Sequence, residues 1–364
     1  DELDRIQEVC YTDNSGTTQS YKYIYTATGA VHSIESTESG RLYLYKYDSK
    51  GQTIGYTEWG KDESGNYTSL LQNRYTYDEE SRIDYWHGTF EYLSNGTTHS
   101  DVIGQEYDYL DYSRESETSI GEMNKLTVLE AGLNRKSTIS YEYDAFYRLT
   151  GKTLDTAGAL SITANYTFRE VSHNTSMLVS NYASSIKIGD TIIDSSSYAY
   201  TYDVDGNITQ IVDGNGKKIS YKYDDLGQLL RENNEVLGKT YVYTYDKGGN
   251  RTSKKTYAYT TATSLSSLTY TEETYTYGNA SWGDQLTAIG STTIAYDKIG
   301  NPTTFNGYDL TWHGRQLKEM EKTGSVIKFL YNADGIRTNK IVNGTDHIYT
   351  LNGTQIVSEA WGTN

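Results

Sequence analysis

Proline, cysteine and aliphatic side chains are scarce in this chain of 364 residues. It contains one proline and one cysteine, and apolar residues make up 36 % of it. One cysteine cannot form an intrachain disulfide, so Cys10 is predicted to be a small buried residue, as unpaired thiols usually are. The chain also has no apolar run of about 18 residues, the length that a membrane-spanning helix needs. We therefore expect no membrane span.

Positive charge is scarce as well. The chain has 32 lysines and arginines against 48 aspartates and glutamates, which gives a formal net charge of −16. Surfaces that bind nucleic acids or anionic membranes need patches of cationic side chains. No run of lysine or arginine provides one, so we expect no nucleic-acid partner.

Tyrosine and glycine are abundant instead. There are 38 tyrosines and 33 glycines, but only 5 phenylalanines and 5 tryptophans. A tyrosine buries a large ring and keeps a polar hydroxyl within reach of water or a hydrogen-bond partner. This composition suits a thin protein wall that is wet on at least one side, and glycine on this scale suits a chain with many turns.

The tyrosines and glycines recur together with aspartate at a fixed spacing. The pattern Tyr-x-Tyr-Asp-x-x-Gly occupies residues 200–206, 221–227 and 243–249, so that consecutive copies begin 21 and 22 residues apart. Self-similarity at such a period is the signature of a repeat protein.

Each copy predicts a β-hairpin. Side chains at i and i+2 share one face of a strand but diverge on a helix. An aspartate followed three residues later by glycine indicates a type I turn that a left-handed glycine closes. Residues 213–216 supply a second turn, so the period holds two antiparallel strands and two turns. The residues predicted to carry this structure are Tyr202, Tyr223, Tyr245 and Tyr296 as ladder rungs, Asp203, Asp224, Asp246 and Asp297 as turn anchors, and Gly206, Gly227, Gly249 and Gly300 as turn closers.

Altered copies of the pattern fill most of the remaining sequence. The repeats are most regular over residues 198–256 and least regular over 94–137. Residues 122–132 fit either a short helix or strands, and we favour strands because a worn turn follows. No linker separates the copies, so we predict one continuous all-β domain over residues 1–364.

The chain opens with Asp1-Glu2-Leu3-Asp4 rather than with methionine and an apolar core. We therefore expect no signal peptide in it. Because the copies begin at once, we also expect the chain to be a fragment of a longer one.

These repeats resemble the YD-repeat (Rhs) family, which includes bacterial Rhs proteins, wall-associated proteins, the C components of insecticidal toxin complexes and animal teneurins. The resemblance extends from about Tyr21 to Gln355. It is strongest at four turns, namely Asp203–Gly206, Asp224–Gly227, Asp246–Gly249 and Asp297–Gly300.

The resemblance implies both a fold and a role. Family members form antiparallel β-hairpin repeats in a continuous spiralling ribbon, and in bacterial members the resulting shell encloses or presents a toxic C-terminal domain. At this length we expect an open section of wall or a small barrel-like spiral. The autoproteolytic family motif contains Asp-Pro, whereas the only proline here follows asparagine, at Asn301-Pro302. Self-cleavage is therefore not implied.

No motif predicts catalysis, a cofactor or a metal. The segment from Asp203 to Asn207 resembles the start of a calcium loop, but it lacks the glutamate expected at the twelfth position, and turn formation explains its residues. The six histidines are scattered without metal-ligand spacing. Neighbouring carboxylates such as Glu272 and Glu273 would face opposite ways on a strand, which makes them poor acid–base pairs.

Three tryptophans are candidates for stacking on sugar rings: Trp59, Trp86 and Trp282. The alternative is that each replaces a tyrosine in the wall, as Trp312 does within its copy of the pattern. Exposed aromatic rings beside polar groups are typical of binding sites, so the exposure of these rings decides between the two.

We predict from these observations a non-catalytic structural segment of a secreted or cell-surface Rhs protein. Its partner would be the rest of its own longer chain, including a C-terminal toxin domain. The alternative is a surface adhesin that binds a glycan or a cell-surface protein through its aromatic residues.

Overall fold

The computed structural model describes residues 1–12, 16, 18–37, 39–61, 64–94, 97–110, 122–130, 135–171 and 174–362. Within these ranges all regular secondary structure is β-strand, and no helix there has the length and apolar character to cross a membrane. The prediction of an all-β chain is confirmed. Within the stretch predicted to be least regular, residues 95–96, 111–121 and 131–134 lie outside the described residues.

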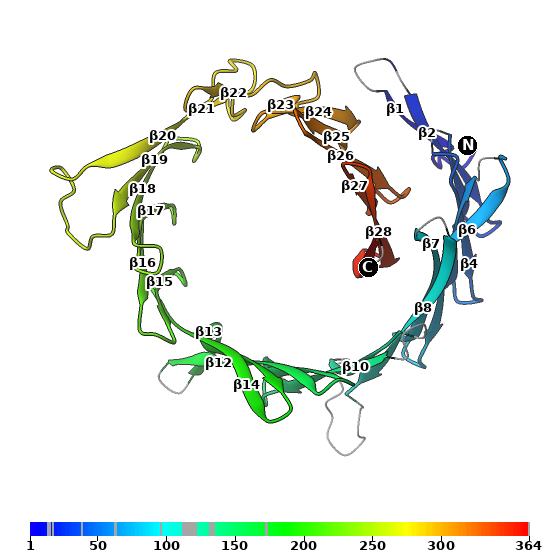
Figure 1. Cartoon of the computed structure of the whole chain (residues 1–364), viewed down its shortest axis with the longest axis horizontal. Helices are drawn as coiled ribbons and strands as arrows, with labels where there is room; N and C mark the ends of the chain where they lie inside the picture. The colour runs from blue at the N-terminus through cyan, green and yellow to red at the C-terminus, as the bar shows by residue number, and fades with distance from the viewer. Residues whose placement is uncertain are drawn as a thin grey trace. The chain divides into compact units, whose positions relative to one another are not determined.

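The strands follow one another, and most are joined by short turns, whereas longer irregular segments precede β20, β21 and β23 (Figure 1). They are β1 (Glu8–Thr12), β2 (Thr18–Tyr25), β3 (Val31–Ser36), β4 (Leu42–Tyr47), β5 (Thr53–Lys61), β6 (Tyr67–Tyr77), β7 (Ile83–Ser94), β8 (Thr97–Tyr109), β9 (Met123–Glu130), β10 (Arg135–Tyr143), β11 (Leu149–Thr156), β12 (Leu160–Val171), β13 (Asn174–Ile188), β14 (Thr191–Tyr202), β15 (Ile208–Asp213), β16 (Lys218–Tyr223), β17 (Leu229–Asn234), β18 (Lys239–Tyr245), β19 (Arg251–Ala258), β20 (Tyr270–Thr276), β21 (Ala288–Ile289), β22 (Thr292–Thr293), β23 (Thr304–Phe305), β24 (Tyr308–His313), β25 (Gln316–Lys322), β26 (Ser325–Tyr331), β27 (Arg337–Val342), β28 (Thr345–Asn352) and β29 (Gln355–Trp361).

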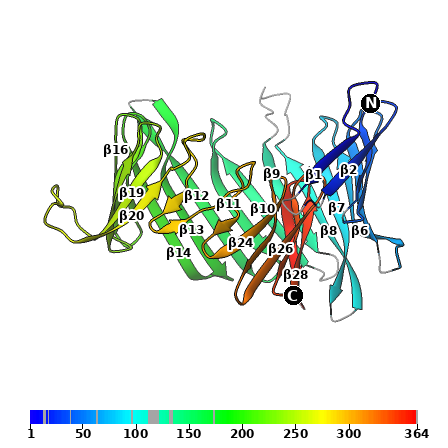
Figure 2. The ribbon, with the colours of Figure 1, turned by 90° about the horizontal axis from the view of Figure 1, so that it is seen from above.

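Each strand pairs with its neighbour in sequence, always antiparallel. This holds from β1 to β8, from β11 to β22 and from β23 to β29. Figure 2 shows β11 to β14 side by side in this order. The predicted chain of antiparallel hairpins is therefore confirmed, and β9 confirms the choice of strands over a helix after residue 122.

The contacts of the chain divide it into two compact units. Unit 1 comprises Asp1–Tyr109, Lys125–Ser137 and Ala295–Asn364, and unit 2 comprises Leu110–Asn124 and Thr138–Ile294. Unit 1 thus combines strands from both ends of the sequence. A single domain over residues 1–364 stays a prediction.

The turn after each Tyr-x-Tyr pair is held by its aspartate. Oδ1 of Asp203 accepts the backbone N–H of Asp205 at 3.0 Å and that of Asn207 at 2.8 Å. Its Oδ2 accepts the side-chain amide of Asn207 at 3.0 Å, and these hydrogen bonds lower the pKa of Asp203. Gly206 has a φ of 87°, in the left-handed region that glycine adopts without strain.

The same turn recurs along the chain, and in the copies with the Tyr-x-Tyr pair at residues 45–47, 200–202, 221–223 and 243–245 it is accompanied by a register shift in the ladder. Two copies place other residues in the glycine position: Ser81 has a φ of 69° and Tyr147 a φ of 60°. Aspartate or asparagine Oδ1 accepts backbone N–H groups in the turns of Asp48, Asp78, Asp144, Asp213, Asp224, Asp246, Asp297 and Asn332.

In most copies the second aromatic residue forms a hydrogen bond to the chain that precedes its own hairpin. The hydroxyl of Tyr223 donates to the carbonyl of Ile208 at 2.8 Å, and that of Tyr245 donates to Leu229 at 2.9 Å. We call these bonds tyrosine tethers. Further tethers join Tyr25 to Ile6, Tyr47 to Val31, Tyr77 to Thr53, Tyr109 to Ile83, Tyr143 to Met123, Tyr202 to Val179, Tyr277 to Arg251 and Tyr331 to Leu317, and the indole N–H of Trp312 makes the equivalent bond to Pro302.

A hydrophobic cluster lies in unit 1. Its members come from the strands β2 to β8, and partly buried rings two positions along, such as Tyr23 and Tyr45, extend the same apolar face. Trp86 and Tyr43 are completely buried at its centre. From the C-terminal part of unit 1, Ala333 in the turn after β26 and Val357 on β29 pack against it. The full cluster is Tyr21, Ile34, Tyr43, Tyr56, Leu71, Trp86, Phe90 and Ile103.

Unit 2 is held by ring contacts as well as by its ladder. Tyr166, Tyr182 and Tyr198 form a row across β12, β13 and β14, with centroids 5.3 and 6.3 Å apart. Serine and threonine hydroxyls bond across the same strands, as Ser184 and Ser196 do at 2.8 Å. Most side chains of β14 are exposed.

Cys10 is exposed, so its predicted burial was wrong. The strand β1 alternates, and Val9 and Tyr11 take its packed face. Cys10 lies between them and therefore points the opposite way.

Gly227 provides a test of the turn. A Cβ there would meet no neighbouring atom within 4 Å, but the φ of 75° is unfavourable for a β-branched residue. We expect Gly227→Val to cost about 1–2 kcal/mol and to lower the melting temperature more than Asp224→Ala does. Ser81→Gly should raise it, because Ser81 already has a left-handed backbone. Equal melting temperatures for wild type and Gly227→Val would contradict the assigned turn.

The tethers can be tested by removing one hydroxyl. Tyr223→Phe keeps the ring but leaves the carbonyl of Ile208 without that donor, which should cost about 0.5–1.5 kcal/mol. Urea unfolding followed by circular dichroism measures this loss. Tyr198→Phe is the control, since its ring is 37 % exposed and should change stability by less than about 0.5 kcal/mol. A urea midpoint of Tyr223→Phe equal to that of the wild type would show that the tether contributes nothing to the free energy of unfolding.

Candidate functional site

The repeat residues singled out in the sequence lie at turns and tethers. Asp203, Asp224 and Asp246 anchor turns, and Gly206, Gly227 and Gly249 adopt positive φ. In the fourth copy, Asp297 and Gly300 repeat this geometry, while Tyr296 forms a β-bridge with Pro302.

Successive turns in unit 2 bring carboxylates together. Asp203, Asp205, Asp224 and Asp225 line one open groove, together with Lys222. Asp203 and Asp224 each begin a turn, and their Oδ1 atoms accept backbone N–H groups of that turn. Across the described ranges, three or more histidine, cysteine, aspartate or glutamate side chains do not gather in a metal-binding arrangement.

The three candidate tryptophans differ in exposure. Trp86 is 0 % exposed, so its predicted role as a sugar-stacking ring was wrong, because the alternation of β7 turns it into the hydrophobic cluster. Trp59 is half-buried. Trp282 is 47 % exposed and sits in a turn between Asn279 and Gln285. Sequence inspection missed Trp361, which is 41 % exposed and stacks on His347.

Buried hydrogen bonds join the C-terminal strands of unit 1 to its N-terminal hairpins. Asn352, the last residue of β28, donates its side-chain amide to Oε1 of Gln105 and to the hydroxyl of Tyr107, both at 2.8 Å. In return the amide of Asn73 donates to the carbonyl of Leu351 at 3.0 Å. Asn352, Leu351 and Asn73 are all buried.

A second group of contacts lies near the start of β4. The guanidinium of Arg41 bonds to Glu58 on the same sheet and reaches Thr338 Oγ1 at 3.3 Å and Asn339 Oδ1 at 3.5 Å on β27. Next to it, Tyr45 bonds to the carboxyl of Asp334. Burial raises the pKa of Asp334 despite that hydrogen bond.

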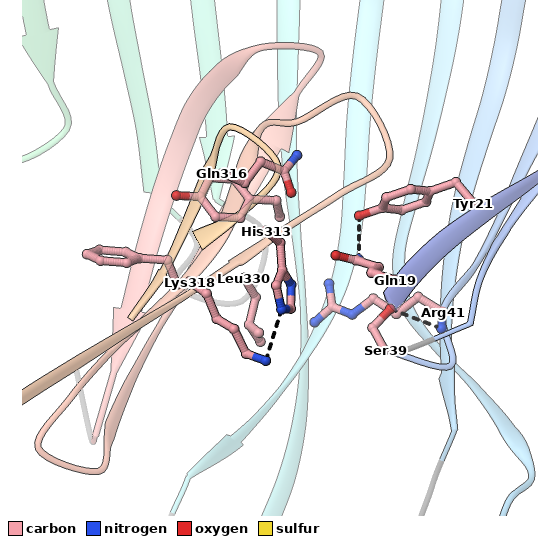
Figure 3. Close-up of a pocket in the computed structure, with 10 residues that line it drawn as sticks. Gln19, Tyr21, Ser39, Arg41, His313, Gln316, Lys318 and Leu330 are labelled. Atoms are coloured by element: carbon pink, nitrogen blue, oxygen red, sulfur yellow. Dashed lines mark hydrogen bonds between the residues drawn. The ribbon is translucent and has the colours of Figure 1, made fainter. Parts of the chain in front are cut away.

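A cavity of about 220 Å³ opens between these two parts of unit 1 (Figure 3). One side is formed by residues of β2 and the segment before β4, and the other by residues of β24, β25 and β26. The lining residues are Gln19, Tyr21, Ser39, Arg41, His313, Gln316, Lys318, Phe329, Leu330 and Tyr331.

Polar groups converge inside this cavity, as Figure 3 shows. Nζ of Lys318 lies 3.1 Å from Nε2 of His313, and the side-chain amide of Gln19 donates to the hydroxyl of Tyr21 at 2.7 Å. His313 is only 6 % exposed. An ammonium group that donates to an imidazole nitrogen requires that nitrogen to be unprotonated.

His313 occupies the aspartate position of its copy of the repeat, between Trp312 and Gly314. There the turn is shorter, since His313 pairs directly with Gln316. A Cβ on Gly314 would overlap the ring of Tyr11, so only glycine fits at this approach of the two sheets. This departure from the repeat is a sequence signal that could have directed attention to the cavity.

The sequence profile of the RHS Repeat family matches residues 202–235 and 223–262. These residues contain the turns of Asp203, Asp224 and Asp246 and the tethers of Tyr223 and Tyr245. The chain therefore carries YD (Rhs) repeats.

Curated relatives of this Rhs chain include the tRNA3(Ser)-specific nuclease WapA of Bacillus spizizenii and the tRNA nuclease WapA of Bacillus subtilis. Each is 28 % identical in an alignment of 224 positions, which covers 46 % of this chain and 9 % of the relative. The chain therefore spans only a small part of these proteins.

Solved structures give the same fold. The structure of TcdB2-TccC3-TEV aligns over 96 % of this Rhs chain and 21 % of its own, with a TM-score of 0.50 and 13 % identity. TcdB2-TccC3 without its hypervariable C-terminal region aligns over 91 % of this chain and 20 % of its own, with a TM-score of 0.50 and 14 % identity.

Asn352 tests how the C-terminal strands are held. Asn352→Ala leaves the buried groups of Gln105 and Tyr107 without this donor, so unit 1 should lose about 1–3 kcal/mol. Amide hydrogen exchange should accelerate in β28 and β29. The control is Asn215→Ala on an exposed turn of unit 2. Exchange in β28 that is equally slow in both variants would contradict the role of Asn352.

Proposed function

We propose that this chain is a non-catalytic wall segment of a longer, secreted or cell-surface Rhs protein. In that protein the hairpin repeats would form part of a shell that encloses or presents a C-terminal toxin domain. The partner of the segment is then the rest of its own polypeptide.

The tyrosine tethers are the observation that carries this proposal. In each tether the hydroxyl of a repeat tyrosine donates to a backbone carbonyl of the preceding hairpin, so it is not available to a ligand. The carboxylate of each turn aspartate likewise accepts hydrogen bonds from backbone N–H groups. The side chains that recur most often therefore build the wall, which favours a structural role over catalysis.

The relatives support only the general part of the proposal, namely a repeat segment within a longer protein. WapA is named as a tRNA nuclease, but the match covers 9 % of its length. The activity in that name belongs to the whole protein. A repeat segment that accompanies an activity located elsewhere in a longer chain fits the proposed role.

The decisive experiment is to isolate the protein from its native source with an antibody against residues 198–256. Intact mass and a denaturing gel then give the size of the polypeptide. We expect a chain much larger than 41.0 kDa, or a second fragment that co-purifies without a covalent bond. A single species near 41.0 kDa with no companion would overturn the proposal.

A surface adhesin is the second candidate, and the exposure of Trp282 favours it. A ring that is 47 % exposed beside polar turn residues can stack on a sugar. A glycan array with the folded chain tests this function, with Trp282→Ala as the loss variant and Trp361→Ala as the matched control. A silent array would exclude glycan binding by this chain.

A further inference from the structure

One edge of the sheet in unit 2 is unpaired along part of β14. β13 pairs with β14 as far as Thr191, whereas β15 pairs with it only over Tyr198–Tyr202. Residues 191–197 therefore have a neighbouring strand on one side and, among the described residues, none on the other. We call this stretch the β14 edge. All of its side chains are exposed.

The β14 edge has the chemistry of a strand-binding site. An unpaired sheet edge presents a row of backbone N–H and C=O groups, and another extended chain is the partner that satisfies such a row. Lysine and proline, which often block pairing at natural edges, are absent from residues 191–197. A register shift lies at Lys187, but the pairing of β14 with β13 from Asp194 to Ser197 is regular. This part of the edge is therefore in the extended conformation that an added strand needs.

A groove of about 380 Å³ borders the β14 edge. Much of its lining from β13 and β14 consists of small side chains, such as Ala183 and the serines at 195–197. The turn after β15 also lines the groove, and it lies so close that a Cβ on Gly214 would be 2.8 Å from Oγ of Ser197. Successive serines point to opposite faces of the sheet. On both faces they leave room for the larger side chains of an incoming strand.

Apolar side chains at the tip of the β13–β14 hairpin indicate that the partner is a protein. Ile188, Ile192 and Ile193 are each more than half exposed, although isoleucine is usually buried. Exposed apolar side chains that gather among polar ones mark protein interaction sites. These three lie where the β14 edge begins, so a strand bound along the edge would cover part of them.

The charged side chains along the edge are carboxylates. Asp194 is the one charged residue of β14, and Asp213 is the one charged residue that lines the groove; both sets of residues are fully described. Asp213 uses Oδ1 to accept two N–H groups of its own turn. Opposite charges on facing strand residues are stabilising. A strand that carries lysine or arginine therefore fits this edge.

A second copy of this chain is a poor occupant of the edge. In the antiparallel register that places Thr191 of one copy opposite Ser197 of the other, the two Asp194 side chains would face each other. Like charges directly opposed across strands are destabilising. The net charge of −16 on each copy adds to this repulsion. The charges favour a different, basic polypeptide.

We propose that the β14 edge binds an extended, basic segment of a partner polypeptide, which adds a strand to the sheet beside residues 191–197. Backbone hydrogen bonds to the edge provide the pairing, and Asp194 and Asp213 select for positive charge. This binding goes beyond the wall function, since it requires no toxin domain in the native protein.

Fluorescein-labelled peptides added to the full chain test the proposal. The probe is Lys-Val-Thr-Val-Thr-Val-Lys, and fluorescence anisotropy should show saturable binding. The same peptide N-methylated at every residue between the lysines loses its N–H donors but keeps its charge, and it should bind at least tenfold more weakly. A peptide with glutamate in place of both lysines should also bind at least tenfold more weakly. Neither comparison needs a variant of the chain.

Hydrogen exchange locates the bound peptide. Amides within residues 191–197 that face away from β13 should exchange at least tenfold more slowly when the probe is bound. Amides of β14 that already pair with β15, within Tyr198–Tyr202, should exchange at an unchanged rate. Protection by the probe at other strands, with none at residues 191–197, would overturn the proposal.

Asp194→Lys tests the charge selection. This exposed position should tolerate the change, and the variant should lose the tenfold preference for the lysine peptide over the glutamate peptide. The matched control is Asp205→Lys, which makes the same change in net charge at an exposed turn outside the groove. The control should keep the preference, and circular dichroism should show that both variants are folded.

Three further outcomes would overturn the proposal. Equal binding of the N-methylated peptide would exclude strand pairing, and equal loss of preference in both variants would exclude a role of Asp194. A dimer in analytical ultracentrifugation whose 191–197 amides are protected without peptide would make a second copy the occupant. None of these outcomes bears on the proposed wall function, which the mass of the native polypeptide decides separately.

Discussion

The hydrogen bond from a repeat tyrosine to the preceding hairpin is the interaction on which this structure depends. A single two-stranded hairpin is marginally stable in water, so a ribbon of hairpins needs bonds that join each one to the next. The ladder between strands supplies some of them, and the tethers add a side-chain bond at the end of each repeat. This explains why the second aromatic position holds tyrosine or tryptophan, both of which can donate, in every tether of the described chain.

The turn and the tether are parts of one device. The anchoring aspartate and the left-handed residue after it create a register shift, as between Thr201 and Tyr202. An extra residue at such a bulge interrupts the ladder and leaves backbone groups in need of partners. The carbonyl of Ile208, directly after the turn, is one such group, and Tyr223 of the next copy bonds to it. A sequence that conserves the turn from copy to copy therefore also has to keep the tyrosine.

The local part of this design could be predicted from the sequence, whereas the packing of unit 1 could not. Asp203 and Gly206 lie within one turn, so their spacing reveals their geometry. The contact of Arg41 with Thr338 joins positions almost 300 residues apart, and no repeat pattern encodes it. Trp86 and Trp282 look alike in sequence, yet one is buried and the other exposed, because only Trp86 lies on the strand face that forms the hydrophobic cluster.

The two units consequently rely on different forces. In unit 1 the apolar face of the hairpins is covered by residues of the C-terminal strands, and hydrophobic burial of roughly 25 cal/mol per Å² adds to the ladder. In unit 2, β14 is mostly exposed, and tethers, tyrosine rows and hydroxyl bonds contribute a larger share of the stability. Directional bonds fix geometry without requiring a second layer of protein. A ribbon built in this way can therefore be extended repeat by repeat, whereas unit 1 depends on its two distant segments meeting, and the cavity forms where that meeting is incomplete.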